Sequence, residues 1–211
     1  THRKLLWIQF LISSIFLLVS FFTIGYYIIT PLLIMGLFSV AYSFFLHKPR
    51  HDGIFKYNGL FKILTLTLIW AGVTGILPVL ASHANWQHSV YLFHFAMRWL
   101  MMLAICLPFD IRDVENDKRN GTITIPAIIG PNNTFVISYI SLILNVSLVM
   151  LSVSWGWNRL SVAITNGIAN IVVMLSIYYS SKHLKNEFSW FLLDGNFIIH
   201  ALIVSSSILF L

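Results

Sequence analysis

The acidic residues of this chain are few, and most of them lie in one short segment. Only 7 Asp and Glu residues occur among 211. Asp110, Asp113, Glu115 and Asp117 all fall within the stretch Leu-Pro-Phe-Asp-Ile-Arg-Asp-Val-Glu-Asn-Asp-Lys-Arg. The three aspartates are spaced i, i+3, i+7, so a helix that continues through them places all three on one face and points Glu115 elsewhere. This segment is the clearest candidate for a chemical site.

Three aspartates on one helix face require a compensating cation. Their carboxylates repel one another, and the C-terminal end of a helix also disfavours anions because of the helix dipole. Mg²⁺ is the natural candidate, because it prefers oxygen ligands and is usually held by one or two carboxylates together with substrate phosphates. The alternative is a solvated acidic loop whose charges pair with three basic neighbours, Arg112, Lys118 and Arg119.

The composition predicts the elements that must hold this cluster. Hydrophobic residues make up 58% of the chain and charged residues 9%, whereas an ordinary soluble domain carries about 25% charged residues. A larger core cannot absorb this difference, because a globule of this size still needs a polar surface. The chain must therefore lie in a lipid bilayer. The net charge of +6 does not indicate a nucleic-acid partner, since the basic residues are spread between hydrophobic runs.

A helix needs about 20 apolar residues to cross the hydrocarbon, and seven stretches of the sequence meet this requirement. The predicted spans are 5–25, 26–46, 60–81, 91–109, 134–154, 160–180 and 190–211. Gly25 marks the turn between the first two. In lipid every backbone amide must be satisfied internally, so we predict one all-α polytopic transmembrane helical bundle of about seven spans, with residues 1–211 as a single domain.

Basic residues lie on alternate connections between these spans. The segments 1–4, 47–62, 110–133 and 181–189 hold 11 of the 13 Lys and Arg residues. If every predicted span crosses the membrane, these segments share one side, which the positive-inside rule makes cytoplasmic. We therefore expect a multi-pass protein of a bacterial inner or plasma membrane, with the aspartate cluster facing the cytoplasm.

A longer pattern continues from the aspartates and carries a resemblance. Asp113-Val-Glu-Asn-Asp117 is followed by Gly121, Thr124 and a short apolar stretch that ends at Gly130. This segment resembles the second aspartate-rich motif of the UbiA superfamily of intramembrane prenyltransferases, which has the form Asp-x-x-x-Asp, then a Gly, a Thr or Ser, and a short apolar stretch ending in Gly.

Weaker similarities extend the resemblance over essentially the whole chain, as the last seven of the family's nine helices. Family members often carry Tyr-Ser at the end of one helix, here Tyr42-Ser43, and a Lys that opens the next helix, here Lys62. Asp194-Gly195 in the last span is also similar. The family's first motif, Asn-x-x-x-Asp-x-x-x-Asp, does not occur in this sequence. Either it lies upstream of Thr1 or this branch lacks it.

The resemblance implies an enzyme that binds an isoprenyl diphosphate through Mg²⁺ and passes the prenyl group to an aromatic or other lipophilic acceptor inside the bilayer. It implies that Asp113 and Asp117 are Mg²⁺ ligands, with Asp110 as a helper. The expected diphosphate-binding residues are Lys62, Lys118, Arg112, Arg98, Tyr42 and Ser43.

Arg98 lies within a predicted span, where a buried charge is costly unless it is paired or faces water. It is predicted either to neighbour the diphosphate or to form a structural ion pair, with Asp194 as a candidate partner. His94 and His200 are expected to be hydrogen-bonded packing residues. Two other functions stay open: a non-catalytic relative that binds an isoprenoid or lipid, and a small transporter in which Arg98 and Asp194 line a polar path.

Overall fold

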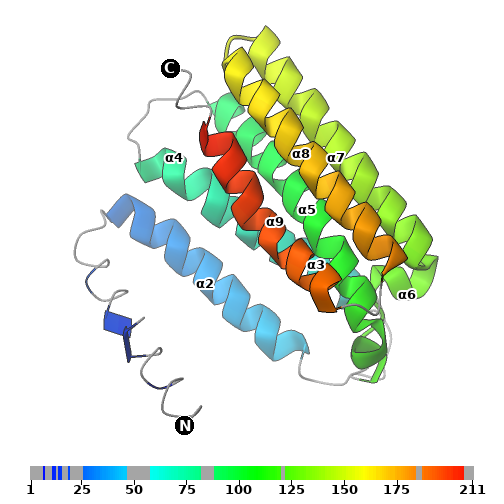
Figure 1. Cartoon of the computed structure of the whole chain (residues 1–211). Coiled ribbons are helices and arrows are strands. Elements are labelled where there is room, and N and C mark those ends of the chain that lie inside the picture. Colours follow the sequence, from blue (N-terminus) through cyan, green and yellow to red (C-terminus); the bar gives the residue numbers. More distant parts are fainter. Residues whose placement is uncertain are drawn as a thin grey trace.

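Helices make up the regular structure of the described part of the chain. The computed structural model describes residues 26–46, 58–81, 88–119, 122–183 and 187–206, together with isolated positions among the first 25 residues. Within these residues every regular element is helical. The long helices lie side by side as a bundle (Figure 1). The predicted all-α fold is therefore confirmed.

The described part of the chain forms the following helices, in this order. Their bounds are α2 (Tyr26–Leu46), α3 (Asn58–Ala71), η2 (Gly72–Ile76), α4 (Leu77–Ala81), α5 (His88–Arg119), α6 (Ile125–Ile129), α7 (Pro131–Ser154), α8 (Leu160–Lys182) and α9 (Glu187–Ser205). The π-helical turn η2 joins α3 to α4, so these three elements form one continuous rod. The end of the bundle at which α6 lies is called the α6 end below (Figure 1).

Among the residues that the structure describes, five helical segments are long and apolar enough to cross a membrane. They are Gly59–Leu80, Ser89–Arg119, Pro131–Ser154, Leu160–Lys182 and Glu187–Ser205. These segments confirm five of the seven predicted spans, and α2 coincides with the predicted span 26–46. The predicted span 5–25 lies almost entirely outside the described residues.

The fifth helix is longer than predicted. We expected the span to end at residue 109, but α5 continues to Arg119 and contains Pro108. A proline within a membrane helix is tolerated where neighbouring groups satisfy the freed backbone carbonyl. Because the helix does not stop, the acidic segment is helical throughout rather than a loop.

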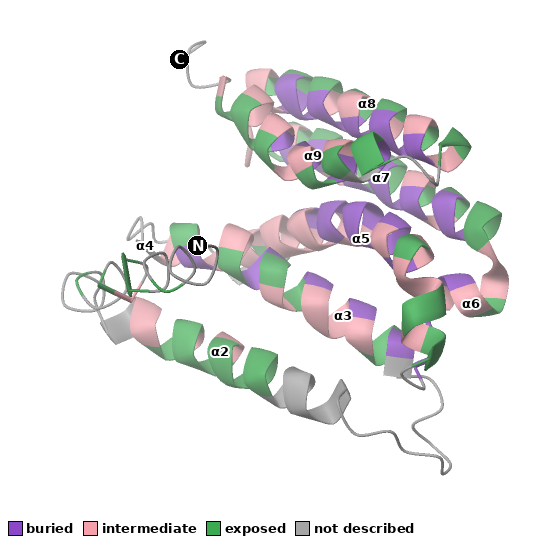
Figure 2. Ribbon diagram, turned by 60° about the horizontal axis from the view of Figure 1, so that its bottom comes forward, coloured by how far each residue is buried: buried purple, intermediate pink, exposed green. Residues whose placement is uncertain are grey.

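The core lies where α5, α7, α8 and α9 meet. Its buried apolar residues are Met101, Ala104, Ile105, Phe135, Leu142, Val173, Ile177 and Leu193. The outer faces of the same helices are apolar too, with Phe191 72% exposed and Leu202 67% exposed. Figure 2 shows buried residues on the inner faces and exposed residues on the outer ones. An apolar exterior of this extent is expected against lipid and not against water.

Buried amides tie three of these helices together. Asn145 on α7 donates from Nδ2 to the carbonyl oxygen of Met97 on α5, at 2.6 Å. Asn170 on α8 donates from Nδ2 to Oδ1 of Asn145, at 3.0 Å. Lipid tails are as apolar as leucine, so helices in a bilayer associate through close packing and such interhelical hydrogen bonds.

Replacing Asn145 by Leu should therefore loosen the bundle. The variant removes both interhelical hydrogen bonds and leaves Asn170 with fewer partners, so the free energy of unfolding should fall by about 1–2 kcal/mol. Reversible unfolding in mixed micelles measures the change. Asn133→Leu is the matched control, because Asn133 is exposed and its side chain bonds only within its own chain segment, to the carbonyl of Ile129. Equal losses in the two variants would contradict the role given to Asn145.

Candidate active site

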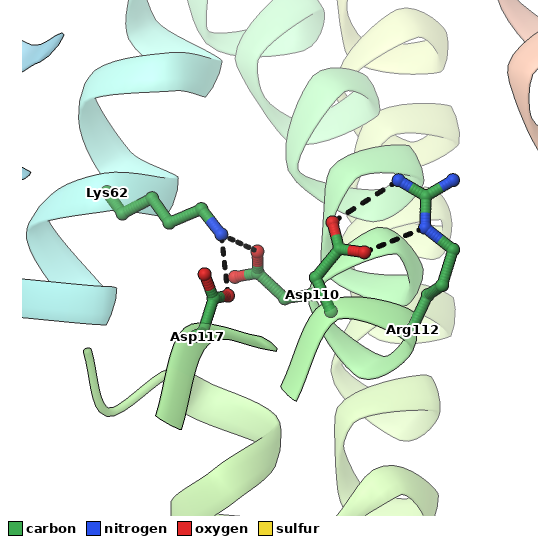
Figure 3. Close-up of polar contacts among 5 residues, drawn as sticks. Lys62, Asp110, Arg112 and Asp117 are labelled. Atoms are coloured by element: carbon green, nitrogen blue, oxygen red, sulfur yellow. Dashed lines mark hydrogen bonds and ion pairs between the residues drawn. The ribbon is translucent and has the colours of Figure 1, made fainter. Parts of the chain in front are cut away.

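Lys62 links α3 to α5 at the α6 end of the bundle. Its Nζ lies 2.7 Å from Oδ2 of Asp117 and 3.3 Å from Oδ1 of Asp110. Figure 3 shows the lysine reaching from α3 and pointing between the two carboxylates of α5. The three groups are shielded from solvent, because the side chain of Lys62 is 17% exposed and that of Asp110 is 5% exposed. An ammonium and two carboxylates thus form one compact, partly buried cluster.

The prediction that the aspartates share a helix face is met by two of them. Asp110 and Asp117 lie about 10 Å apart along the axis of α5, and their side chains converge on one ammonium. Asp113 takes another partner, because Arg112 holds it with Nε at 2.9 Å from Oδ1 and Nη2 at 3.2 Å from Oδ2. The guanidinium of Arg112 also lies 5.3 Å from the centre of the Phe109 ring.

The pair of Arg112 and Asp113 can exchange partners at little cost. Both side chains are well exposed, at 41% and 37%, and an ion pair of that exposure is worth about 0.2–1 kcal/mol. Asp113 is therefore available to a stronger cation, whereas Asp110 is held by burial. The predicted roles of these aspartates as Mg²⁺ ligands stay predictions.

The other predicted site residues lie in several places. Lys118, a predicted diphosphate-binding residue, is exposed, as are its neighbours Glu115 and Arg119. None of the three forms an ion pair with another described residue. Tyr42 and Ser43 are in α2, but their side chains lie outside the described residues.

Arg98 is not part of the cluster. It lines a separate cavity toward the opposite end of α5. The ion pair predicted with Asp194 is not present among the described residues, where Asp194 is exposed. The two residues point to different parts of the bundle, since they lie at different heights on α5 and α9.

A glycine sets the approach of Lys62 to α5. The backbone N–H of Gly59 donates to the carbonyl oxygen of Ile123, at 3.2 Å. A Cβ on Gly59 would overlap that oxygen and the Cα of Thr124. Only glycine therefore lets the start of α3 lie directly on the segment that follows α5, which brings Lys62 within reach of Asp117. The sequence analysis missed this contact, although Asn58-Gly59 is a turn signal directly before the helix.

The apolar stretch after the aspartates is a short helix that turns the chain back into the bundle. The helix α6 ends at Gly130, whose φ of +82° is costly for any residue with a side chain. Pro131 then begins α7, at the helix position that tolerates proline best. Position 130 therefore requires glycine because of its backbone conformation.

The donor set fits Mg²⁺ shared with a diphosphate. Oδ2 of Asp110 is buried and has no hydrogen-bond partner among the described residues. Two carboxylates around one ammonium also leave a negative charge uncompensated. The described residues contain no group of three or more His, Cys, Asp or Glu side chains placed to hold a metal ion. An ion that takes one or two carboxylates and completes its shell with phosphate oxygens and water satisfies all three observations.

An apolar cavity of about 390 Å³ lies between α2 and α3. Its lining residues are Ile34, Met35, Phe38, Phe61, Thr65, Leu68 and Ile69. Phe61 directly precedes Lys62, and the lining of α3 extends from there over about 12 Å of helix. The cavity is open to the outside of the bundle, since Phe38 is 61% exposed and Phe61 is 55% exposed. It lies on the α2 side of α3, whereas Lys62 on the same helix pairs with α5.

Comparison with known families assigns the chain. The sequence model of the UbiA prenyltransferase family matches residues 2–199. The chain belongs to this family. A search of curated proteins and a search of solved structures found no match. In this UbiA family protein, the matched region contains the whole of the Lys62 cluster and the apolar cavity, so family membership supports a prenyltransferase-like function inside the membrane.

A methyl group at Gly59 should disturb this UbiA family site without touching its charges. In Gly59→Ala the added Cβ meets backbone atoms of Ile123 and Thr124, which cannot move aside as a side chain can. We expect Lys62 to be displaced from Asp117, and the free energy of unfolding to fall by about 1–3 kcal/mol. Hydrogen exchange at the amide of Thr122, which donates to the carbonyl oxygen of Asp117, should accelerate. Gly36→Ala is the control, because its Cβ meets nothing within 4 Å; protection equal to wild type in Gly59→Ala would refute the close packing.

Removing the ammonium of Lys62 should be costly, and removing a carboxylate as well should restore stability. Lys62→Met leaves Asp110 buried without its cation, and breaking a buried ion pair in this way costs about 3–5 kcal/mol. Lys62→Met/Asp110→Asn should recover most of that loss, because the neutral amide carries no uncompensated charge. Unfolding free energies of the wild type, both single variants and the double variant give the coupling. Additive losses would show that the two groups do not interact.

Proposed function

We propose that the protein transfers an isoprenyl group from an isoprenyl diphosphate to an aromatic or other lipophilic acceptor within the membrane, with Mg²⁺ as its cofactor. The observation that carries the proposal is the placement of Lys62 between Asp110 and Asp117, with an apolar cavity on the α2 side of the same helix. The Lys62 cluster would bind the charged diphosphate, and the apolar cavity would bind the hydrocarbon chain. Family membership supports the reaction class.

The charged end would recognise the diphosphate through an exchange of partners. Asp117 and Asp113 would hold Mg²⁺, with Asp110 as a helper, and the ion when bound would neutralise diphosphate oxygens. Lys62 would then turn from the carboxylates to the phosphate oxygens, which lie in the same partly buried space. Arg112 is close enough along α5 to leave Asp113 for the same purpose, since its present pair is weak.

The chemistry in this proposal is the breaking of the allylic carbon–oxygen bond. The diphosphate leaves with the bonding electrons, the prenyl carbon bonds to a nucleophilic atom of the acceptor, and the acceptor loses a proton. Lys62 stabilises the negative charge that grows on the bridging oxygen, and such stabilisation by a group already in place is usually the largest catalytic term. Burial of the cluster strengthens it, because the local dielectric constant is low.

The hydrocarbon end would hold the prenyl chain. The cavity between α2 and α3 is apolar, and its lining begins at the residue before Lys62, so a chain lying in it would cross α3 to bring its diphosphate to the cluster. Phe61 and Phe38 line the cavity, and an aromatic face close to the charged end can stabilise an allylic cation. The acceptor, being lipophilic, would reach the same place from the bilayer.

The distribution of charge supports a cytoplasmic site. Lys62, Arg112, Lys118 and Lys182 all lie toward the α6 end of the bundle, whereas Arg159 begins α8 at the other end. By the positive-inside rule the α6 end would face the cytoplasm, where soluble diphosphates and Mg²⁺ are present. A bacterial inner or plasma membrane is the proposed location.

A second candidate is a non-catalytic relative that binds an isoprenoid without transferring it. The pairing of Asp113 with Arg112 favours it, because this carboxylate is engaged by a cation of the chain itself. Such a protein would bind an isoprenyl diphosphate and give no product. The transporter alternative requires Arg98 and Asp194 to line one path, and these side chains lie apart in the described structure.

Turnover distinguishes the two candidates. Purified full-length protein in lipid nanodiscs would receive radiolabelled isoprenyl diphosphates, Mg²⁺ and a panel of quinone precursors. The wild type should form prenylated product, and chelation by EDTA should abolish it. Asp117→Ala and Asp113→Ala should each lower kcat by about 100-fold or more.

Glu115→Ala is the matched control, because Glu115 is an exposed carboxylate on the same turns of α5 and should keep wild-type activity. Unchanged product in both aspartate variants would overturn the proposed catalytic role. Saturable binding of the diphosphate with no product from any acceptor would favour the non-catalytic relative.

A further inference from the structure

A polar cavity lies at the end of the bundle opposite α6. It has a volume of about 190 Å³ and lies among α5, α7, α8 and α9. Its polar lining residues are His94, Arg98, Asn145, Asn158, Asn166 and His200. Arg98 precedes Asp110 by twelve positions on α5, which is about 18 Å of helix. This cavity is therefore separate from the Lys62 cluster, and it plays no part in the proposed transfer reaction.

The guanidinium of Arg98 brings a positive charge into the cavity without a counter-charge. It lies within 4.0 Å of no carboxylate among the described residues, and its recorded polar contact is Sδ of Met101 at 3.9 Å. Six of the chain's 7 acidic residues are described, and they lie on the α6-side halves of α5 and α9. The seventh, Asp52, is outside the described residues. A cation within the bundle is costly unless an anion compensates it.

His200 adds a hydrogen-bonding group beside this charge. It is 1% exposed, and neither Nδ1 nor Nε2 has a hydrogen-bond partner among the described residues. The expectation that His200 is a hydrogen-bonded packing residue is thus wrong. A neutral imidazole carries one N–H donor, and a buried polar group without a partner costs about 1–3 kcal/mol. A ligand that accepts a hydrogen bond would remove that cost.

Neighbouring groups hold the cavity in shape. A Cβ on Gly75 of η2 would lie 3.2 Å from Cγ of Arg98, so the absence of a side chain there makes room for the arginine stem. Asn158 donates from Nδ2 to Oγ of Ser152, at 2.8 Å, and Asn145 donates to the backbone of α5. The polar wall is therefore held by contacts from η2, α5, α7 and the connection between α7 and α8.

Charge and volume define the ligand. Arg98 is the one permanently charged group that lines the cavity, so its counterpart is a monoanion. The remaining lining is apolar, from Met97, Met101, Val149, Val162 and Val204. A cavity of about 150 Å³ holds one benzene ring, so this one has room for a ring and a carboxylate. A phosphate would bring more charge than one arginine offsets, and would leave the apolar wall without a partner.

We propose that this cavity is a binding site for a small monocarboxylate with an apolar body, of the size of benzoate, whose carboxylate bridges Arg98 and His200. The two residues come from α5 and α9, so occupancy would also hold these helices together at the end remote from the Lys62 cluster.

Sodium benzoate is the probe that tests the site. Full-length protein in nanodiscs would be titrated by calorimetry, and its Tm would be followed at increasing benzoate concentrations. The wild type should bind saturably with a rise in Tm, because a ligand that binds only the folded state stabilises it. Arg98→Gln should weaken binding at least tenfold, while its ligand-free Tm should not fall, since the change removes an uncompensated charge.

Three comparisons complete the test. Arg159→Gln should bind benzoate as the wild type does, because Arg159 is exposed at the same end of the bundle outside the cavity. His200→Phe should also weaken binding, and it keeps the experiment decisive if Arg98→Gln does not fold. Benzamide, which has the same ring without the charge, should bind more weakly than benzoate.

The proposal fails if the wild type shows no saturable benzoate binding, or if Arg98→Gln or His200→Phe retains the wild-type affinity. Equal affinity for benzamide and benzoate would exclude an anion site. Tighter binding of inorganic phosphate than of benzoate would exclude the monocarboxylate. None of these outcomes bears on prenyl transfer, which is measured separately at the other end of α5.

Discussion

A buried charge in a membrane bundle must be compensated, and in this protein the compensation fixes how the helices meet. Asp110 is almost fully enclosed on α5, and the ammonium that neutralises it comes from Lys62 on α3. Asp117, which lies two turns further along α5, pairs with the same ammonium. Breaking such a pair costs several kcal/mol because the remaining charge has no access to water. The close contact at Gly59, the continuation of α5 to Arg119 and the return of the chain through α6 are all conditions for bringing these three groups together.

The sequence predicts the bundle well because length and apolarity alone decide whether a segment can cross a bilayer. It also predicts that Asp110 and Asp117 share a helix face, since helical spacing is a local property. Which side chains form ion pairs with one another is not a local property, and the sequence predicted these pairs less completely. Lys62 was predicted to bind a diphosphate, which stays a prediction, and in the structure it pairs with two carboxylates. Asp113 prefers the adjacent Arg112, whose long side chain folds back on the same turn. Gly59 matters only through a contact with Ile123, which lies far along the chain.

The two ends of α5 carry charges of opposite sign that are not fully compensated. At the α6 end, the carboxylates of Asp110 and Asp117 share the one ammonium of Lys62, so a metal ion and a diphosphate would complete the balance. At the opposite end, Arg98 has no described carboxylate near it, so an anion would do so. The apolar core formed by Met101, Ile105 and their neighbours separates the two. A single helix can hold both because its interior hydrogen bonds leave the side chains free to face different surroundings.

The central claim is that the Lys62 cluster is built to receive a diphosphate. Equilibrium binding of inorganic pyrophosphate with Mg²⁺ tests it most directly, with full-length protein in nanodiscs and the stability-compensated variant Lys62→Met/Asp110→Asn. The account predicts saturable binding to the wild type and to Lys182→Met, an exposed lysine toward the same end of the bundle, with affinity reduced at least tenfold in the double variant. Equal affinity for the double variant and the wild type would contradict the account.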